Sequence, residues 1–377
     1  MLVVTKISCA IYNFLIILLV TILGEAQSSG QLLILIGAIN LGSIFARLGS
    51  DTYWISAGER NITIVQNELY YHLVLTILTA ALLTIFVIAD NFDITKYFMI
   101  FFSVFTQFVL SMLARIMQLN GEHVQSLSAQ LLGGNTIAIP IFLLFNIEPL
   151  LCVFLSHFCI LILLLFFARS KLEYYTVVAE PFSHRLHHFP QLLIGGINQN
   201  IVAIFGWVLG LASFVATTLT LQRLFGIVLW PVSIEMQRVL PRIGELVQTE
   251  KPIVPFIRNI QRRLLKTVIL LGGIIIFLIW IGNHFIGFLG ELSFYSVIFL
   301  GVSMTISSHY SMYNAVLSLL SGGGILIGIL CLSLILSGMT LMFGENGNSL
   351  ILVLGSFLVS SSLAAFLVVT RYKRIGE

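Results

Sequence analysis

Apolar segments of helical length follow one another along the whole chain, with short polar connections between them. A helix needs about 20 mostly apolar residues to cross the hydrocarbon core of a bilayer. The pattern therefore predicts an all-α polytopic membrane protein with about twelve transmembrane helices. The expected spans lie near residues 4–23, 31–56, 69–89, 97–118, 125–146, 148–168, 191–211, 213–236, 267–288, 292–316, 323–343 and 349–370.

The two longest polar stretches are residues 169–190 and 237–266. The first of them separates the spans into two groups of six. We therefore expect an N-terminal six-helix bundle over 1–168, a cytoplasmic connector over 169–190 and a C-terminal six-helix bundle over 191–377. Neither stretch is long enough to form a soluble domain.

Composition supports a membrane protein. The chain has 377 residues, of which 58% are hydrophobic and only 9% charged, whereas soluble domains carry about 25% charged residues. The net charge of +3 gives no indication of nucleic-acid binding. The four cysteines lie in apolar segments without metal-ligand spacing, and His184, His187 and His188 lie in the basic connector, where contact with lipid headgroups is the favoured interpretation. No metal and no cofactor are expected.

Basic residues indicate the orientation of the chain in the membrane. If the N-terminus is cytoplasmic and twelve spans alternate, the basic residues of the connectors at 169–190 and 237–266 and of the C-terminus all face the cytoplasm. Only Lys96 falls on the outer side, near Asp90 and Asp93. The excess of Lys and Arg on cytoplasmic loops predicts that both termini are cytoplasmic. The outward connections are short.

Three charged residues lie well inside predicted spans, away from the span ends. Arg47 and Asp51 are one helical turn apart in 31–56, and Arg223 lies in 213–236. A charge at the centre of a bilayer costs roughly 2.5–3.5 kcal/mol on insertion scales. Arg47 and Asp51 can pair, either as a structural ion pair or as charges of a cavity. Arg223 has no acid within a turn of its helix, so it needs either a partner on another helix or an anionic ligand. Phosphate suits such a ligand, because a guanidinium bonds its oxygens bidentately.

Polar side chains in two other spans are further candidates. Asn198 and Asn200 open the seventh span, and Tyr310 and Asn314 lie in the tenth. Such residues either link neighbouring helices or line a hydrated cavity, and both alternatives stay open. The candidate substrate-binding residues are therefore Arg223, Arg47, Asp51, Asn198, Asn200, Tyr310 and Asn314.

The chain carries no Walker A, HExxH or GxSxG motif. We therefore expect a transporter rather than an enzyme, with no catalytic residues.

A short internal match relates the two halves. RLGSDTYWISAGE (47–59) and RLFGIVLWPVSIE (223–235) share Arg, Leu, Trp and Glu at the same spacing. Both segments belong to the second helix of their half, and both run inward in the expected topology. Transporters are often built from two similar halves, so the match is either a parallel duplication or chance.

Two longer segments carry a family resemblance. GAINLGSIFARLGSDTYWISAGERN (37–61) and ASFVATTLTLQRLFGIVLWPVSIEMQRVLPRIGEL (212–246) resemble the second and eighth helices of bacterial polysaccharide and O-antigen flippases, which belong to the multidrug/oligosaccharidyl-lipid/polysaccharide (MOP) exporter superfamily. The resemblance implies two six-helix bundles around a central cavity. Arg47, Asp51 and Arg223 match intramembrane charged sites of that pattern. The first helix departs from some relatives because it carries no Arg.

The resemblance also implies a function. A flippase of this kind moves undecaprenyl-pyrophosphate-linked oligosaccharide repeat units of O-antigen or capsule across the bacterial cytoplasmic (inner) membrane by alternating access. Its expected partners are that lipid-linked oligosaccharide, the bilayer and the polysaccharide polymerase machinery. The chain lacks the two additional C-terminal helices typical of lipid II flippases, which favours the O-antigen or capsule branch.

Two alternatives remain. A cation or drug antiporter of the same fold would need carboxylates in its cavity. A membrane polysaccharide polymerase would need a long external loop, whereas the outward connections here are 24–30, 90–96, 284–291 and 344–348.

Overall fold

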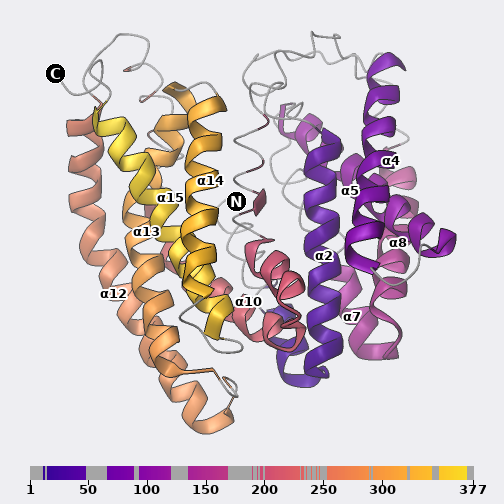
Figure 1. Ribbon diagram of the computed structural model, residues 1–377, viewed down its shortest axis with the longest axis horizontal. Helices are drawn as coiled ribbons and strands as arrows, with labels where there is room; N and C mark the ends of the chain where they lie inside the picture. The colour runs from indigo at the N-terminus through magenta and orange to yellow at the C-terminus, as the bar shows by residue number, and fades with distance from the viewer. Residues whose placement is uncertain are drawn as a thin grey trace. The chain divides into compact units, whose positions relative to one another are not determined.

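The structure of the protein is a computed structural model. It describes residues 12, 15–47, 66–88, 93–119, 135–168, 189, 193, 196–197, 200–229, 231–232, 235, 239, 243, 246, 253–287, 289, 292–320, 323–341 and 348–371. The regular structure of these residues is helical throughout, without a strand, as the sequence predicts (Figure 1).

The chain forms two compact units, an N-terminal unit (Met1–Ala216) and a C-terminal unit (Thr217–Glu377). The helices of the N-terminal unit are α2 (Ala26–Arg47), α4 (Gln66–Ile88), α5 (Ile94–Leu119), α7 (Asn135–Phe145) and α8 (Pro149–Ala168). Helix α10 (Ala212–Gly226) begins in this unit and continues into the next. The C-terminal unit adds η2 (Ile227–Leu229), α12 (Val254–Ile286), α13 (Phe294–Leu320), α14 (Gly323–Thr340) and α15 (Asn348–Arg371). The bundle boundaries at 168 and 191 stay predictions.

Several helices have the length and composition of membrane spans. In the described part of the chain, five apolar segments are long enough to cross a bilayer: Ala26–Arg47, Ile94–Ala114, Ala212–Leu229, Val254–Phe285 and Asn348–Thr370. Large apolar side chains such as Leu270 and Phe277 of α12 are exposed, as a lipid-facing surface requires. The chain is therefore a multi-pass membrane protein.

The start of α12 differs from the expected span at 267–288. The helix already begins at Val254, so that Arg258, Arg262 and Lys266 lie on a helix and not in a loop. The buried positions of this extension, Ile257, Ile260 and Gln261, recur at helical spacing, while the basic residues are exposed. A search for continuous apolar runs misses such an amphipathic extension.

Helix α2 packs against α4, α5 and α8 in the N-terminal unit (Figure 1). Glycine makes part of this packing possible, because a Cβ on Gly42 would come within 2.8 Å of Leu83. His72 of α4 is buried, and its Nδ1 lies 2.7 Å from the carbonyl oxygen of Ala46. These contacts fix the C-terminal end of α2, the end that carries Arg47.

In the C-terminal unit, α13 packs closely along α15. A Cβ on Gly355 would approach Phe299 to 2.5 Å, and the hydroxyls of Ser307 and Ser362 are hydrogen-bonded at 2.9 Å. A hydrogen bond from Ser308 to the carbonyl of Val228, 3.1 Å long, connects α13 to η2 directly after α10. The end of α10 that carries Arg223 is therefore attached to α13.

Candidate functional site

Arg223 lies in the last turn of α10, and its side chain is exposed. In the described part of the chain, its guanidinium has no hydrogen-bonded or ion-paired partner, whereas its neighbours Thr220 and Gln222 do have interactions. The helix around it is apolar and qualifies as a membrane span. Arg223 is therefore a cation at a membrane-spanning position whose hydrogen-bonding groups are available to a ligand.

Arg47 is placed differently. It is half-buried in the last turn of α2, and its Nε donates a hydrogen bond to the carbonyl oxygen of Ser43 at 3.1 Å. Part of the guanidinium is thus engaged by its own helix. Asp51 lies outside the described residues, so its pairing with Arg47 stays a prediction.

Asn200 is buried and bonds within its own helix. Its Nδ2 donates to the carbonyl oxygen of Gly196 at 2.8 Å. Its side chain also lies against α2, since a Cβ on Gly37 would come within 3.4 Å of the Asn200 Oδ1. Asn200 therefore packs against α2, while its hydrogen bond stays within its own helix. Asn198 lies outside the described residues.

Tyr310 of α13 is half-buried among aromatic rings. Its ring centroid lies 5.0 Å from that of Phe366 and 5.0 Å from that of His309. Asn314 belongs to the same helix, but its side chain lies outside the described part of the structure. Of the candidates described, Arg47 and Asn200 belong to the N-terminal unit, and Arg223 and Tyr310 to the C-terminal unit.

A buried polar network lies beside Tyr310. Tyr313 is fully buried, and its hydroxyl donates to Oε1 of Gln261 on α12 at 3.2 Å. The Nε2 of Gln261 in turn donates to the carbonyl oxygen of His309 at 2.6 Å. The guanidinium of Arg258, one turn before Gln261 on α12, interacts electrostatically with the same hydroxyl. The network ties α12 to α13, and the sequence alone gave Gln261 no special role.

The N-terminal unit contains a cavity of about 410 Å³, within the range of about 300–1,000 Å³ that small-ligand pockets usually have. Its walls come from the first turns of α2, α5, α8 and α10 and from the end of the helix over 200–208. The lining residues are Gln27, Gln31, Ile34, Leu35, Lys96, Glu148, Pro149, Leu150, Gly206, Trp207, Gly210 and Ala212.

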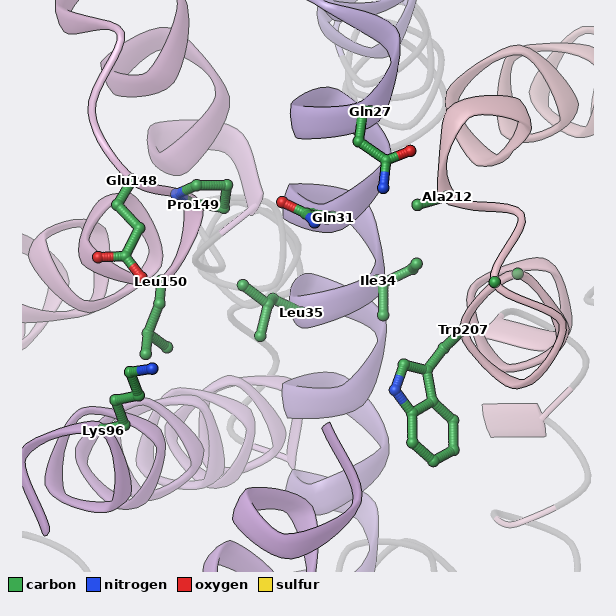
Figure 2. A pocket seen from close by; sticks show the side chains of 12 residues that line it. Gln27, Gln31, Ile34, Leu35, Lys96, Glu148, Pro149, Leu150, Trp207 and Ala212 are labelled. Carbon is green, nitrogen blue, oxygen red and sulfur yellow. The ribbon is translucent and has the colours of Figure 1, made fainter. Parts of the chain in front are cut away.

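The cavity combines polar, charged and aromatic groups (Figure 2). Figure 2 shows Gln27 and Gln31 on α2, with Glu148 and Lys96 on one side of this helix and Trp207 on the other. Lys96 and Glu148 do not form an ion pair with each other, although both line this cavity. None of these residues was a candidate from the sequence, because each lies near a span end, where polar and aromatic residues are common. Among the cavity residues, only Lys96 was unusual in the sequence, because it was the one basic residue expected on the outer side.

No protein-family model matches the chain, and no curated protein matches it significantly. Among solved structures, the chain is similar to the inward-facing conformation of a multidrug resistance MATE family transporter of the MOP superfamily. The TM-score is 0.61 at 14% identity, and the alignment covers 95% of this chain and 92% of that chain. The chain therefore has a MATE-like fold.

Two further solved structures align with TM-scores below 0.5. A mutant of a MATE transporter from Vibrio cholerae aligns at 14% identity with a TM-score of 0.48, over 97% of this chain and 92% of that one. A eukaryotic MATE transporter aligns at 14% identity with a TM-score of 0.46, again over 97% and 92%. The first similarity confirms the all-α fold class expected from the sequence.

Proposed function

We propose that the protein is a flippase that moves undecaprenyl-pyrophosphate-linked oligosaccharide repeat units across the bacterial cytoplasmic membrane. The observation that carries the proposal is Arg223, an exposed cation on an apolar membrane-spanning helix with no protein partner among the described residues. A charge in such a place is costly. A pyrophosphate offsets this cost, because its oxygens accept the parallel hydrogen bonds of a guanidinium.

The fold supports a route for the cargo. In many secondary transporters the substrate site lies near the bilayer midplane, and alternating access exposes it to each side in turn. Arg223 binds the pyrophosphate, Arg47 is a further positive charge that contacts the cargo during transport, and the lipid tail stays in the bilayer. Both termini are cytoplasmic in this arrangement.

The test replaces the chain in cells that depend on it for surface polysaccharide. Arg223→Ala removes the ligand-binding cation and is expected to lower surface polysaccharide by about tenfold or more, with lipid-linked repeat units accumulating on the cytoplasmic face. Arg223→Lys keeps the charge but loses bidentate bonding, so partial export is expected. Lys266→Ala removes an exposed charge of α12 and is the matched control. Normal surface polysaccharide in Arg223→Ala, at equal expression, contradicts the proposal.

A drug antiporter is the second candidate, because the solved structure with the highest similarity given above is described as a multidrug resistance transporter. Such a protein needs a carboxylate that faces a cavity, and Glu148 lines one. The antiporter predicts export of cationic dyes that is lost in Glu148→Gln. The flippase predicts no dye export by either form. Dye efflux from cells that overproduce the wild-type chain or Glu148→Gln separates the two functions.

A further inference from the structure

The cavity of the N-terminal unit has the chemistry of a carbohydrate site. We propose that it binds acidic sugar residues of the oligosaccharide; the choice of ligand class rests on the proposed function. Arg223 is not among the residues that line the cavity, so the cavity takes a part of the cargo other than the pyrophosphate.

Two glutamines provide hydrogen bonds for hydroxyl groups. Gln27 and Gln31 are four residues apart on α2, so both point from one face of that helix, and both are exposed. An amide side chain offers donors and an acceptor at once. Sugar hydroxyls also donate and accept, so amides at this spacing match two neighbouring hydroxyls.

Trp207 provides an apolar surface in the cavity, on the other side of α2 from Lys96 and Glu148 (Figure 2). The C–H face of a pyranose ring carries partial positive charge, and the face of an indole is negative, so the two attract when stacked. Gly206 and Gly210 line the same wall. Because glycines have no side chains, this wall leaves room for a ring.

The charges of the cavity favour an acidic sugar. Lys96 is half-buried and forms no ion pair with Glu148. The first turns of α2, α5, α8 and α10 all contribute to the walls, and the N-terminus of each helix carries a partial positive charge. A carboxylate on the sugar therefore meets Lys96 and these helix ends, while Glu148 accepts hydrogen bonds from hydroxyls.

The expected topology gives this site a place in the transport cycle. All the lining residues lie close to outward connections of the predicted spans, such as 24–30 and 90–96. The cavity therefore faces the side on which the oligosaccharide leaves. Weak binding of the sugars at this site stabilises the outward-open state of the transporter. It still allows the transported oligosaccharide to dissociate.

The experiment measures binding of soluble tetrasaccharides to the purified full chain in nanodiscs, by calorimetry. The acidic probe is hyaluronan tetrasaccharide, which contains glucuronate, and the neutral probe is chitotetraose. We expect tighter binding of the acidic probe. Trp207→Ala weakens the binding of both probes by about tenfold, and Trp207→Phe retains most of it. Lys96→Gln weakens only the acidic probe.

Trp280→Ala is the control, because Trp280 is exposed on α12 and is not among the residues that line the cavity. It is expected to leave both affinities unchanged. Absence of binding to the wild-type chain, or equal losses in Trp207→Ala and Trp280→Ala, overturns the sugar site.

The two proposals fail in different ways. Export that depends on Arg223, with no tetrasaccharide binding, overturns the sugar site and leaves the flippase standing. Binding lost in Trp207→Ala, with normal export by Arg223→Ala, upholds the site and overturns the flippase.

Discussion

At the scale of single residues, the surroundings of the two intramembrane arginines differ. Arg223 is exposed without a protein partner in the described part of the chain, while Arg47 is half-buried and bonded to the carbonyl of Ser43. A guanidinium has five donors in a fixed fork. The Ser43 bond engages Arg47 with its own helix, so Arg223 is the better placed of the two to bind an anionic ligand.

A charge exchange tests what Arg47 does. If Arg47 binds an anionic cargo, the double variant Arg47→Asp with Asp51→Arg moves the cation by a full helical turn, and export is expected to stay at least about tenfold below the wild type. A purely structural pair tolerates exchange, because its attraction does not depend on which member carries which charge. The measurement is surface polysaccharide at matched expression. Recovery to the wild-type level in the double variant, but not in either single variant, identifies a structural pair.

The Gln261 network gives a prediction on stability. Gln261→Leu leaves the buried Tyr313 hydroxyl without its acceptor, so we expect a loss of about 1–3 kcal/mol in the free energy of unfolding. Thermal unfolding of the detergent-solubilised protein measures the effect. Asn259→Ala, at an exposed position two residues earlier on α12, is expected to change stability by no more than about 0.5 kcal/mol. Equal transition temperatures for the two variants contradict a role of the network in joining α12 to α13.

The sequence predicts some of these residues better than others. Arg223 is visible because a charge inside an apolar segment is unusual whatever the tertiary structure. Gln31 and Trp207 are not visible in this way, because polar and aromatic residues near span ends are common and only the packing of several helices brings them to one cavity. Asn200 is the opposite case: it is visible in the sequence as a polar residue in a span, but in the structure its side chain bonds to its own helix.

At the scale of helices, the approach of α2 to α10 depends on glycine. A Cβ on Gly30 would collide with the carbonyl oxygen of Ala212, the first residue of α10. The main-chain atoms of Ala212 cannot move out of the way as the end of a flexible side chain can, so an added Cβ would push the two helices apart. The contact lies beside Gln31 and Ala212, two residues of the cavity wall, so the close approach of these helices sets the width of the cavity.

Gly30→Ala is therefore expected to destabilise the protein by about 1–3 kcal/mol, the usual cost of overpacking. The matched control is Gly328→Ala on α14, where nothing lies within 4 Å of an added Cβ. This control is expected to be neutral or to stabilise its helix by up to about 1 kcal/mol. Unfolding temperatures in detergent compare the two variants. A Gly30→Ala protein as stable as Gly328→Ala contradicts the close approach of α2 and α10.

Helix boundaries show where sequence patterns are informative. Helix α15 (Asn348–Arg371) agrees with its expected span to within one residue at each end, because its apolar run has clear polar limits. Helix α12 begins 13 residues earlier than its expected span, since 267 − 254 = 13. Its basic extension is amphipathic, and packing of the apolar side is what keeps it helical.

At the scale of the whole molecule, the expected spans and the distribution of charge together predict which side of the membrane each helix end faces. The residues of the cavity wall, such as Gln27 and Glu148, fall at outward ends of the expected spans, while Arg262 on α12 falls at an inward end. The orientation itself follows only from the excess of basic residues on one side. The fold fixes which ends lie together, and the charges determine which side faces the cytoplasm.

Cysteine labelling tests this orientation. In a chain whose native cysteines are replaced by alanine, Gln27→Cys and Arg262→Cys each present a thiol at an exposed position. A membrane-impermeant maleimide applied to intact cells is expected to label Gln27→Cys, because residues 24–30 face outward. Arg262→Cys is expected to react only after the cytoplasmic membrane is permeabilised, since the positive charges around it hold that end of α12 in the cytoplasm. Labelling of Arg262→Cys in intact cells contradicts the expected orientation, because it places that end of α12 outside the cell. Labelling of both positions from one side requires an even number of spans between residues 27 and 262, whereas the expected topology has seven and therefore places them on opposite sides.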